Sequence, residues 1–291
     1  MTTAEDIHGY RQRIAHFERS LQSSPNVSRE DYELIQDYKR HSLLSGITEG
    51  RVARHLFDLR LICEWLECEL TKASVKDIEK LVLKIEESHY APSVKRDLKL
   101  TIRRFFRWLK KTDDYPPEVR WIKARIKETK IKSPEEMLSE ADVLKIINQC
   151  RTDRDRALVS TLYESGCRVG ELIPIMIKHV CFDEYGALLH VTGKTGYRRV
   201  RIHACVPALK KWLNNHPDRG NPEAYVWYYH GKYITYTRFC VLVREAAHRA
   251  GIKKSVNPHN FRHSRATFLA NHLTEAQMKV YFGWVQASKM A

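Results

Sequence analysis

Residues 166–172 read GCRVGEL, and they separate two helical patterns in the second half of the chain. A helix is predicted over residues 154–164, because Ser165-Gly166 is a typical stop signal, and another helix begins just after it. From about residue 182 to residue 202 the apolar residues alternate with a period of two around a Gly-bounded turn, which predicts a small β-sheet. Helical spacing then returns in four segments, at about residues 207–215, 237–250, 260–271 and 274–282. This half of the chain is therefore expected to be α+β and mostly helical.

The first half is predicted to be helical throughout. Residues 28–111 repeat apolar side chains at helical spacing, and Ser74 and Asp77 form a predicted capping box. A second box, Ser139 to Asp142, opens the later domain. We expect four segments in order: an N-terminal helical extension (1–27), a helical domain (28–112), a proline-containing linker (113–136) and an α+β domain (137–291).

The chain carries a large excess of positive charge. Its 50 Lys and Arg residues against 35 Asp and Glu residues give a formal net charge of +15 over 291 residues. Such a surplus favours a polyanionic partner, most commonly nucleic acid. The densest cations lie on the predicted helix at about 92–111, where we expect contacts with DNA phosphates, although a solvated helix face is the alternative. These cations are Lys95, Arg96, Lys99, Arg103, Arg104 and Arg107.

Several classes of protein are disfavoured. No apolar run approaches the length that spans a bilayer, and the first residues lack the pattern of a secretory signal. The seven cysteines are widely spaced and include no CxxC pair, which argues against a disulfide scaffold or a zinc ribbon. A reducing cytoplasm is the expected setting.

The residues that could carry chemistry are weak signals when taken singly. His259 and His263 have helical spacing, but no Glu stands where a metalloprotease needs one and no third ligand suggests itself, so no metal is expected. Lys194 follows a glycine, but Leu188 occupies the position where a nucleotide-binding P-loop requires glycine. No nucleotide cofactor is expected either.

Taken in order, these motifs resemble the tyrosine recombinases of the integrase and Xer-type group. The pattern is Arg168 followed three residues later by Glu171, then Lys194 in a hairpin, His259-x-x-Arg262 and Gly283-Trp284. The resemblance covers about residues 28–291. It implies a helical core-binding (SAM-like) domain and an α+β catalytic domain that grip opposite faces of duplex DNA.

The resemblance also implies a role for each residue. Arg168 and Arg262 would hold the non-bridging oxygens of one phosphodiester and stabilise its pentacoordinate transition state. Lys194 would protonate the departing 5′ oxygen, His259 would assist proton transfer, and the Trp284 indole would donate a hydrogen bond. Glu171 and His263 would support the site. No metal is needed, because the cationic side chains supply the positive charge.

The pattern breaks at the nucleophile. In this family a tyrosine follows the Gly-His or Gly-Trp motif by nine or ten residues, whereas residues 285–291 read VQASKMA. Tyr281 precedes the motif. We therefore expect this chain to bind DNA but not to cleave it. Truncation of a working enzyme is the favoured explanation, and a natural fragment or a DNA-binding variant are the alternatives.

The expected activity of the intact protein is site-specific recombination through a 3′-phosphotyrosyl bond. A homotetramer on double-stranded DNA, associated with the nucleoid, is the expected assembly. Arg238, Arg244 and Asn260 are candidates for base contacts. Relaxation of supercoils, as by a type IB topoisomerase, and DNA-binding regulation without cleavage are the rival functions.

Overall fold

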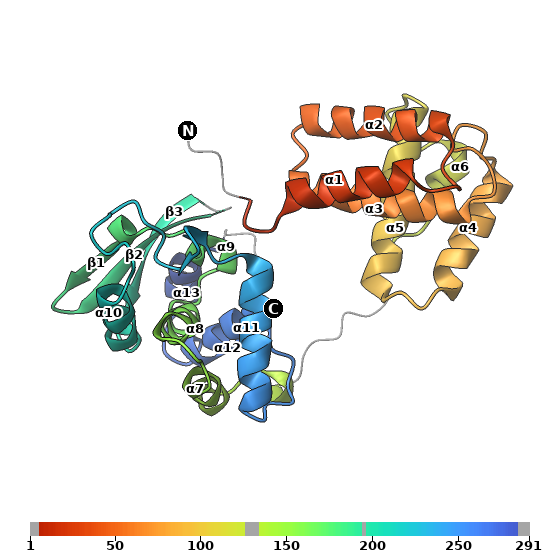
Figure 1. The fold of residues 1–291 in the computed structure, drawn as a ribbon. Helices are drawn as coiled ribbons and strands as arrows, with labels where there is room; N and C mark the ends of the chain where they lie inside the picture. Colours follow the sequence, from red (N-terminus) through yellow and green to blue (C-terminus); the bar gives the residue numbers. More distant parts are fainter. Residues whose placement is uncertain (1–5, 126–133, 194–195, 285–291) are drawn as a thin grey trace. The chain divides into compact units, whose positions relative to one another are not determined.

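The computed structural model describes residues 6–125, 134–193 and 196–284. Within these ranges the chain forms two compact units (Figure 1). The helical unit contains residues 9–125, and the catalytic unit combines residues 6–8 with the described residues from 134 onward. Each unit is described by itself below.

The helical unit is an assembly of helices joined by short turns. Its elements are α1 (Tyr10–Gln22), α2 (Arg29–Leu44), α3 (Glu49–Trp65), α4 (Val75–Glu87), α5 (Pro92–Leu109) and α6 (Pro117–Arg120). Ser74 begins α4 with the predicted capping box, since its hydroxyl accepts a hydrogen bond from the Asp77 amide and the Asp77 carboxylate accepts one from the Ser74 amide. Pro92 at the first turn of α5 is preorganised for a helix start.

Helix α3 lies at the centre of this unit and is buried along most of its length. Its side chains Leu56, Leu59 and Ile62 belong to the same buried cluster as Ile102 and Phe105 of α5. A hydrogen bond of 2.7 Å from Thr101 Oγ1 to Asp58 Oδ2 also joins α5 to α3. The basic helix therefore has a fixed apolar face, and of its predicted DNA-binding cations only Lys99 is buried.

The units do not divide where the composition suggested. Val119 and Ile122 lie in the segment expected to be a linker, yet both are buried in the core of the helical unit. This unit therefore continues past residue 112, at least to Ile122. The predicted N-terminal extension is also split, because α1 packs on α3 whereas Ile7 belongs to the core of the catalytic unit.

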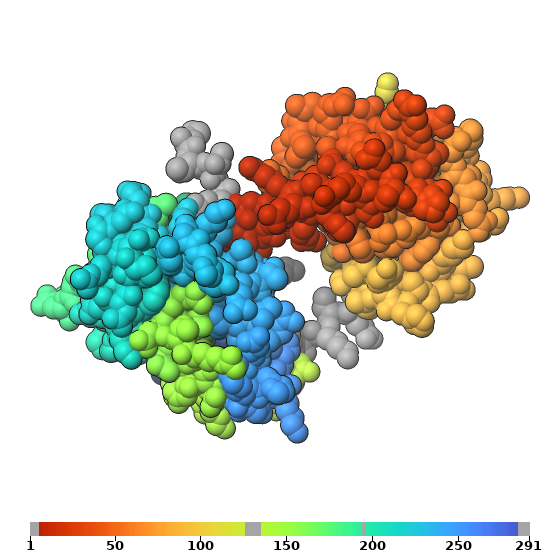
Figure 2. Space-filling model, in the orientation of Figure 1, coloured from red at the N-terminus to blue at the C-terminus, as the bar shows by residue number. Residues whose placement is uncertain are grey.

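The catalytic unit contains seven α-helices in its described part. They are α7 (Glu140–Asn148), α8 (Asp153–Ser165), α9 (Val169–Leu172), α10 (Val206–Asn214), α11 (Tyr236–Arg249), α12 (Pro258–Leu269) and α13 (Glu275–Phe282), with short 3₁₀ turns η1 (Pro134–Glu136) and η2 (Ile177–His179). Helices distant in sequence pack together, since α7 lies against α11 (Figure 2). Arg249 Nη2 donates to the Gln149 carbonyl at 3.0 Å.

A three-stranded antiparallel sheet accompanies these helices, in the order β1 (Val180–Asp183), β2 (Gly186–Gly193) and β3 (Gly196–Ile202). Gly193 pairs with Gly196 at the root of the β2–β3 hairpin. Burial alternates along β2 and β3, so that Leu189, Val200 and other apolar residues face the core. Arg198 occupies the same inward phase as Val200, which places a cation on the core face of the sheet.

An N-terminal strap, residues 6–8, lies on the catalytic unit. Ile7 is 5% exposed, and its carbonyl accepts a hydrogen bond of 3.2 Å from the Tyr236 amide at the start of α11. The His8 and Tyr236 rings are 4.8 Å apart. Ile7 also lies close to Gly170, within α9. The strap thus covers the short helix that follows Arg168.

The expected fold class is confirmed: the protein is mainly helical, with a small antiparallel sheet. The analysis of periodicity missed β1 and the hairpin of β4 (Tyr228–Tyr229) and β5 (Lys232–Tyr233), whose strands have only two residues each. Such short strands are too short to show a period of two. Among the described residues, no helix has the length and apolar character required to span a membrane.

Candidate active site

Arg168 stands at the junction of α8 and α9, and its geometry depends on Gly166. Gly166 ends α8 with a φ of 56°, in the left-handed region, and a Cβ there would lie 2.4 Å from Phe282 Cε1. Glycine is therefore required for both its conformation and its lack of a side chain. The chain then turns so that Arg168 begins α9, with its side chain 31% exposed.

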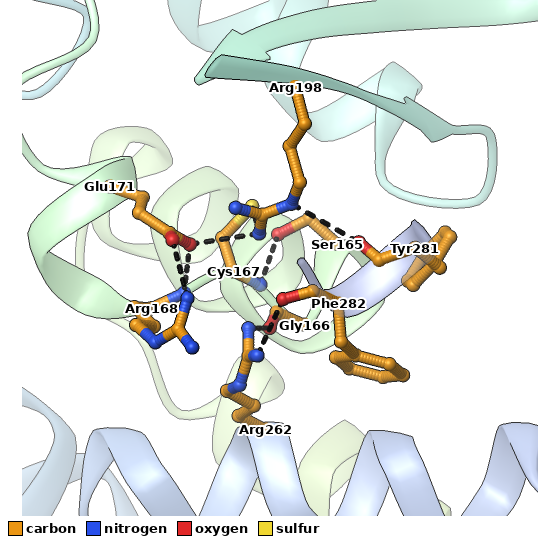
Figure 3. A network of polar contacts seen from close by, with 9 residues as sticks. All are labelled: Ser165, Gly166, Cys167, Arg168, Glu171, Arg198, Arg262, Tyr281 and Phe282. Atoms are coloured by element: carbon orange, nitrogen blue, oxygen red, sulfur yellow. Dashed lines mark hydrogen bonds and ion pairs between the residues drawn. The ribbon is translucent and has the colours of Figure 1, made fainter. Parts of the chain in front are cut away.

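Glu171 holds Arg168 at two points (Figure 3). The Arg168 amide donates to Glu171 Oε2 at 2.8 Å, and Arg168 Nη1 donates to Oε1 at 2.9 Å. Glu171 is only 2% exposed. Burial opposes its ionisation, but hydrogen bonds from Arg198 and Arg168 outweigh this effect and lower the pKa of Glu171 below its usual value. A permanent carboxylate thus anchors the first arginine.

Arg262 projects from α12 and bridges the ends of two helices. Its Nη1 donates to the Gly166 carbonyl at 2.6 Å and its Nη2 donates to the Phe282 carbonyl at 2.7 Å, so the guanidinium caps α8 and α13 together (Figure 3). Arg262 is 8% exposed. Burial and the nearby charge of Arg168 lower its pKa to about 10, which leaves it cationic at neutral pH.

A third arginine, Arg198, reaches the same place from β3. Its Nη2 donates to Glu171 Oε2 at 2.8 Å and its Nε donates to the Tyr281 carbonyl at 3.2 Å. Sequence reasoning missed this residue. The signal was available, because Arg198 has the same strand phase as Val200 and Ile202, and a charged residue on a buried face indicates a specific partner.

The Gly-Trp motif ends α13 beside this cluster. Gly283 has a φ of 61°, and the Trp284 amide donates to the Lys279 carbonyl at 2.9 Å. The Trp284 ring stacks on Phe282 with centroids 4.9 Å apart. Arg262 therefore binds the carbonyl of the residue on which Trp284 stacks.

The surroundings of Tyr281 make it a poor nucleophile. Its hydroxyl donates to the Glu164 carbonyl at 2.8 Å, and burial raises its pKa to about 12. A phenol that is buried, hydrogen-bonded and hard to ionise is poorly suited to attack a phosphate. This geometry agrees with the position of Tyr281 before the motif rather than after it.

The remaining predicted site residues are His259, His263 and Lys194. His259 is exposed on α12, one turn before Arg262, and His263 is exposed on the same helix. Lys194 lies outside the described residues. Its neighbour Gly193 is placed, and a Cβ on Gly193 would lie 2.6 Å from Glu171 Oε1. The root of the hairpin therefore touches the anchoring carboxylate.

The three residues predicted to contact bases differ in their exposure. Arg238 and Arg244 are exposed on α11. The expectation for Asn260 is wrong, because Asn260 is 4% exposed and its side-chain amide donates to the Ser255 carbonyl. Its position just inside the start of α12 explains this burial. In the described part of the chain, no group of three potential metal ligands occurs.

The cations of α5 divide into two sets. Lys99 is buried and ion-paired with Glu86 of α4, while Lys95 donates to the Glu86 carbonyl at 2.6 Å. Arg96 pairs with its neighbour Asp97 at 2.8 Å. The three cations in the amino-terminal half of α5 are therefore engaged by partners in their own unit.

The carboxyl-terminal half of α5 is more open. Arg103 lies over the Tyr115 ring, with its Cζ 3.8 Å from the centroid. Arg104 and Arg107 line a cavity of about 990 Å³, together with Tyr38, His41 and other residues of α2 and α5. DNA contact by these cations remains a prediction, and the structure favours Arg104 and Arg107 over Lys99.

Comparison with known proteins identifies the family. The model of the phage integrase family matches residues 136–289, a little over half of the chain. This chain belongs to the phage integrase family. It is thus a tyrosine recombinase family protein, as the order of its motifs indicated, and the catalytic unit described above is the part that the family model covers.

Relatives and solved structures agree over most of the length of this integrase-family chain. It is 26% identical to tyrosine recombinase XerD of Yersinia pestis, over 84% of this chain and 86% of the relative. It is 25% identical to a tyrosine recombinase of Thermosipho africanus, over 81% and 84%. Lambda integrase, solved as a tetramer bound to a Holliday junction, matches with a TM-score of 0.70 and 15% identity, over 89% and 79%.

Another structure extends the likeness to nearly the whole integrase-family chain. The XerH site-specific recombinase bound to its difH substrate matches with a TM-score of 0.66 and 16% identity, over 99% of this chain and 93% of that one. At such identities the likeness concerns the fold. The fold of both units is therefore that of tyrosine recombinases.

Proposed function

We propose that the cluster of Arg168, Glu171, Arg198 and Arg262 receives one phosphodiester of duplex DNA. The observation that carries this proposal is the convergence of three guanidinium groups: Arg168 and Arg198 bind the Glu171 carboxylate, and Arg262 binds the Gly166 carbonyl directly before the Cys167-Arg168 turn (Figure 3). Their charges leave an excess of two positive charges. A phosphodiester carries one negative charge, and the pentacoordinate transition state of its transesterification carries two, so the site matches the transition state better than the ground state.

Arg262 has more donors than its two helix contacts use. A guanidinium has five N–H groups, and Arg262 donates through Nη1 to Gly166 and through Nη2 to Phe282. Arg168, whose side chain is 31% exposed, lies on the other side of the proposed phosphate position. Arginine suits both positions better than lysine, because its planar fork matches the geometry of two non-bridging oxygens.

Three further residues complete the proposed reaction. Lys194 protonates the departing 5′ oxygen, and the contact of Gly193 with Glu171 supports this by bringing the hairpin root to the cluster. His259, one turn before Arg262, assists proton transfer. The Trp284 indole N–H donates to a phosphate oxygen, and Trp284 stands two residues after the carbonyl that Arg262 binds. Glu171 and, less directly, His263 support these groups.

The proposed function is site-specific recombination of double-stranded DNA. The chain would bind DNA through the catalytic cluster, α11 and the open cations of α5, with no metal or nucleotide cofactor. Assembly as a tetramer on DNA is proposed by analogy with the lambda integrase tetramer on a Holliday junction. The nucleoid of the cytoplasm is the corresponding location.

The order of the motifs assigns no nucleophile among residues 285–291, which follow Trp284. Residues 285–291 contain no tyrosine, and the hydroxyl of Tyr281 is engaged with Glu164. We therefore propose that this 291-residue polypeptide binds DNA without forming a covalent bond to it. A tyrosine supplied beyond these residues would complete the strand-cleaving enzyme.

The phosphate site can be tested with duplexes recovered by binding from a randomised pool. Affinity for the recovered duplex is measured by fluorescence anisotropy for the wild type, Arg168→Ala, Arg262→Ala and the exposed control Arg199→Ala. We expect each site variant to lose about 1–3 kcal/mol of binding, as for a charge-assisted contact. Replacing the contacted phosphate by a neutral methylphosphonate should abolish that difference. Equal affinities for the wild type and both site variants would contradict the proposal.

The missing nucleophile needs a separate assay. A nicked version of the recovered duplex, which traps a cleaved strand, is incubated with the 291-residue polypeptide. No adduct that survives denaturing gel electrophoresis is expected. A covalent adduct would show that a nucleophile is present, and sequencing of the attached peptide would identify it.

A further inference from the structure

Arg198 joins three segments that carry other residues of the site. Its side chain is 10% exposed, on the inward face of β3. It donates to Glu171 in α9 at 2.8 Å and to the Tyr281 carbonyl in α13 at 3.2 Å, and it lies 3.6 Å from Cys167 Sγ (Figure 3). One guanidinium thus contacts the α8–α9 turn, α9 and α13 from the hairpin strand.

Glu171 transmits the first of these contacts. Its Oε2 accepts hydrogen bonds from both Arg198 and the Arg168 amide, while its Oε1 accepts from the Arg168 guanidinium. Gly193, at the hairpin root, packs against the same carboxyl group. Because Glu171 is buried, loss of Arg198 leaves a buried carboxylate with one cationic partner instead of two. The carboxyl group is then free to tilt, and Arg168 tilts with it.

The second contact fixes the end of α13. The carbonyls of Tyr281 and Phe282 are consecutive, and each accepts a hydrogen bond from a different arginine: Arg198 binds the first and Arg262 the second. Free carbonyls at a helix end carry partial negative charge, so cations there are favourable. Removing Arg198 takes away one of the two arginine contacts at the turn before Trp284, and Arg262 keeps the other.

We propose that Arg198 is a positioning residue for phosphoryl transfer, which sets the place of Arg168 through Glu171 and the place of the Gly283-Trp284 turn through Tyr281. The inference rests on the proposed phosphate site. Arg198 acts without touching the phosphate: Nε and Nη2 are engaged, and Nη1 is buried from solvent and finds no partner among the described residues.

The test uses sulfate as a probe and the 291-residue protein with ¹⁵N-labelled arginine. The Nε–Hε signal of Arg168, assigned by its loss in Arg168→Lys, reports sulfate binding at this site. We expect Arg198→Met to weaken sulfate binding about tenfold, because small displacements of a positioned group are costly. Arg199→Met is the matched control, since Arg199 is the neighbouring residue on β3 and is exposed. Its loss of one charge should change the affinity less than about twofold.

Arg198→Lys separates positioning from simple charge. The variant keeps the positive charge but replaces a fork by a single ammonium group, which cannot hold Glu171 and Tyr281 together. We expect it to bind sulfate nearly as poorly as Arg198→Met. Wild-type affinity in Arg198→Lys would overturn the proposal and leave Arg198 as a source of charge only. This variant also serves if Arg198→Met does not fold.

A pH series gives a second readout. In the wild type the lowered pKa of Glu171 keeps the carboxylate ionised, whereas in Arg198→Met we expect the pKa of Glu171 to rise. The quantity compared is the ratio of the sulfate affinities of Arg198→Met and the wild type at each pH from about 7 to 5, because changes from histidines near the site, which both proteins share, then cancel. This ratio should fall as the pH is lowered, and sulfate keeps both charges throughout. A constant ratio would count against the proposed link through Glu171.

The two proposals can fail separately. If sulfate leaves the Arg168 signal of the folded wild type unchanged, the phosphate site itself is in doubt. The Arg168 signal without sulfate still tests Arg198, because it should shift in Arg198→Met and Arg198→Lys but not in Arg199→Met. An unshifted signal in both Arg198 variants would overturn the positioning role.

Discussion

Arg262 Nη2 lies 2.7 Å from the carbonyl oxygen of Phe282, so a residue proposed to bind phosphate also caps the last helix of the described chain. The same guanidinium binds the Gly166 carbonyl at 2.6 Å. Stability of the catalytic unit and readiness of its phosphate site therefore depend on one side chain. Substitution at this position should affect both.

Arg262→Lys should lower the free energy of unfolding of the catalytic unit by about 2–3 kcal/mol, because a single ammonium nitrogen cannot take the places of both Nη1 and Nη2, and one buried, charge-assisted hydrogen bond is lost. Hydrogen exchange of peptides from α8 and α13 measures this loss. Arg199→Lys, on the exposed face of β3, is the control and should be neutral. Unchanged protection in Arg262→Lys would show that the two carbonyls find other partners.

Gly166→Ala should be more damaging than an ordinary glycine substitution. The left-handed φ of 56° alone costs about 1 kcal/mol, and displacement of the Phe282 ring adds to it. Gly251→Ala is a matched control, because Gly251 has a φ of 71° but nothing within 4 Å of its added Cβ. Urea unfolding should therefore rank Gly166→Ala well below Gly251→Ala, and equal losses would mean that Phe282 moves aside freely.

Two buried groups in the helical unit should give opposite pH dependences. Burial raises the pKa of Asp58 to about 6, despite Arg54 beside it, so its contribution is present at low pH and is lost as the pH rises through 6. Burial and the charges of Arg104 and Arg51 lower the pKa of His55 to about 4, so its contribution is lost as the pH falls from 6.5 to 4.

Asp58 and His55 change the stability of the helical unit with pH in opposite directions, so their effects nearly cancel in the wild type. Variants that lack one of the two residues should show the effect of the other. In Asp58→Asn, stability of the helical unit should rise with pH between about 4 and 6.5 more steeply than in the wild type, because the opposing contribution of Asp58 is removed and that of His55 remains. In His55→Gln it should fall over about pH 4 to 6. Hydrogen exchange of α3 and α5 peptides follows this unit specifically. Parallel slopes in the two variants would contradict the assignment.

Ile7→Ala should destabilise the catalytic unit although residue 7 precedes the helical unit in sequence. Ile7 is 5% exposed within the catalytic core, and truncation of such a side chain costs about 2–3 kcal/mol. Val280→Ala is the control, since Val280 is 78% exposed in the same unit. Protection of α9 and α11 should fall only in Ile7→Ala, whereas that of α3 should not change.

Local signals predicted much of the fold. The boxes at Ser74 and Ser139 mark helix starts because the pairing of hydroxyl and carboxylate is completed within four residues. Gly166 marks a helix stop for an equally local reason. Arg168, Glu171 and Arg262 were found by their order, and the structure shows why the order matters: all three meet around the carboxyl ends of α8 and α13.

The features that the sequence analysis missed depend on contacts between residues far apart in the chain. Lys99 looked like one cation among several, but its partner Glu86 belongs to another helix. Arg198 was not singled out in the sequence, yet in the structure it contacts Cys167, Glu171 and Tyr281. The N-terminal strap had no pattern of its own, and only the tertiary structure shows that Ile7 fills a place in the catalytic core. A single sequence contains no direct record of such contacts.

The strap makes the catalytic unit discontinuous in the gene. A fragment that begins near residue 134 would carry every residue of the phosphate cluster, but it would leave an apolar hole beside Gly170 where Ile7 belongs. Protease cleavage between residues 126 and 133 would likewise leave the strap covalently attached to the helical unit and not to the catalytic unit on which it packs. A recombinant catalytic unit should therefore carry residues 1–8 fused to it through a linker, rather than begin simply at residue 134.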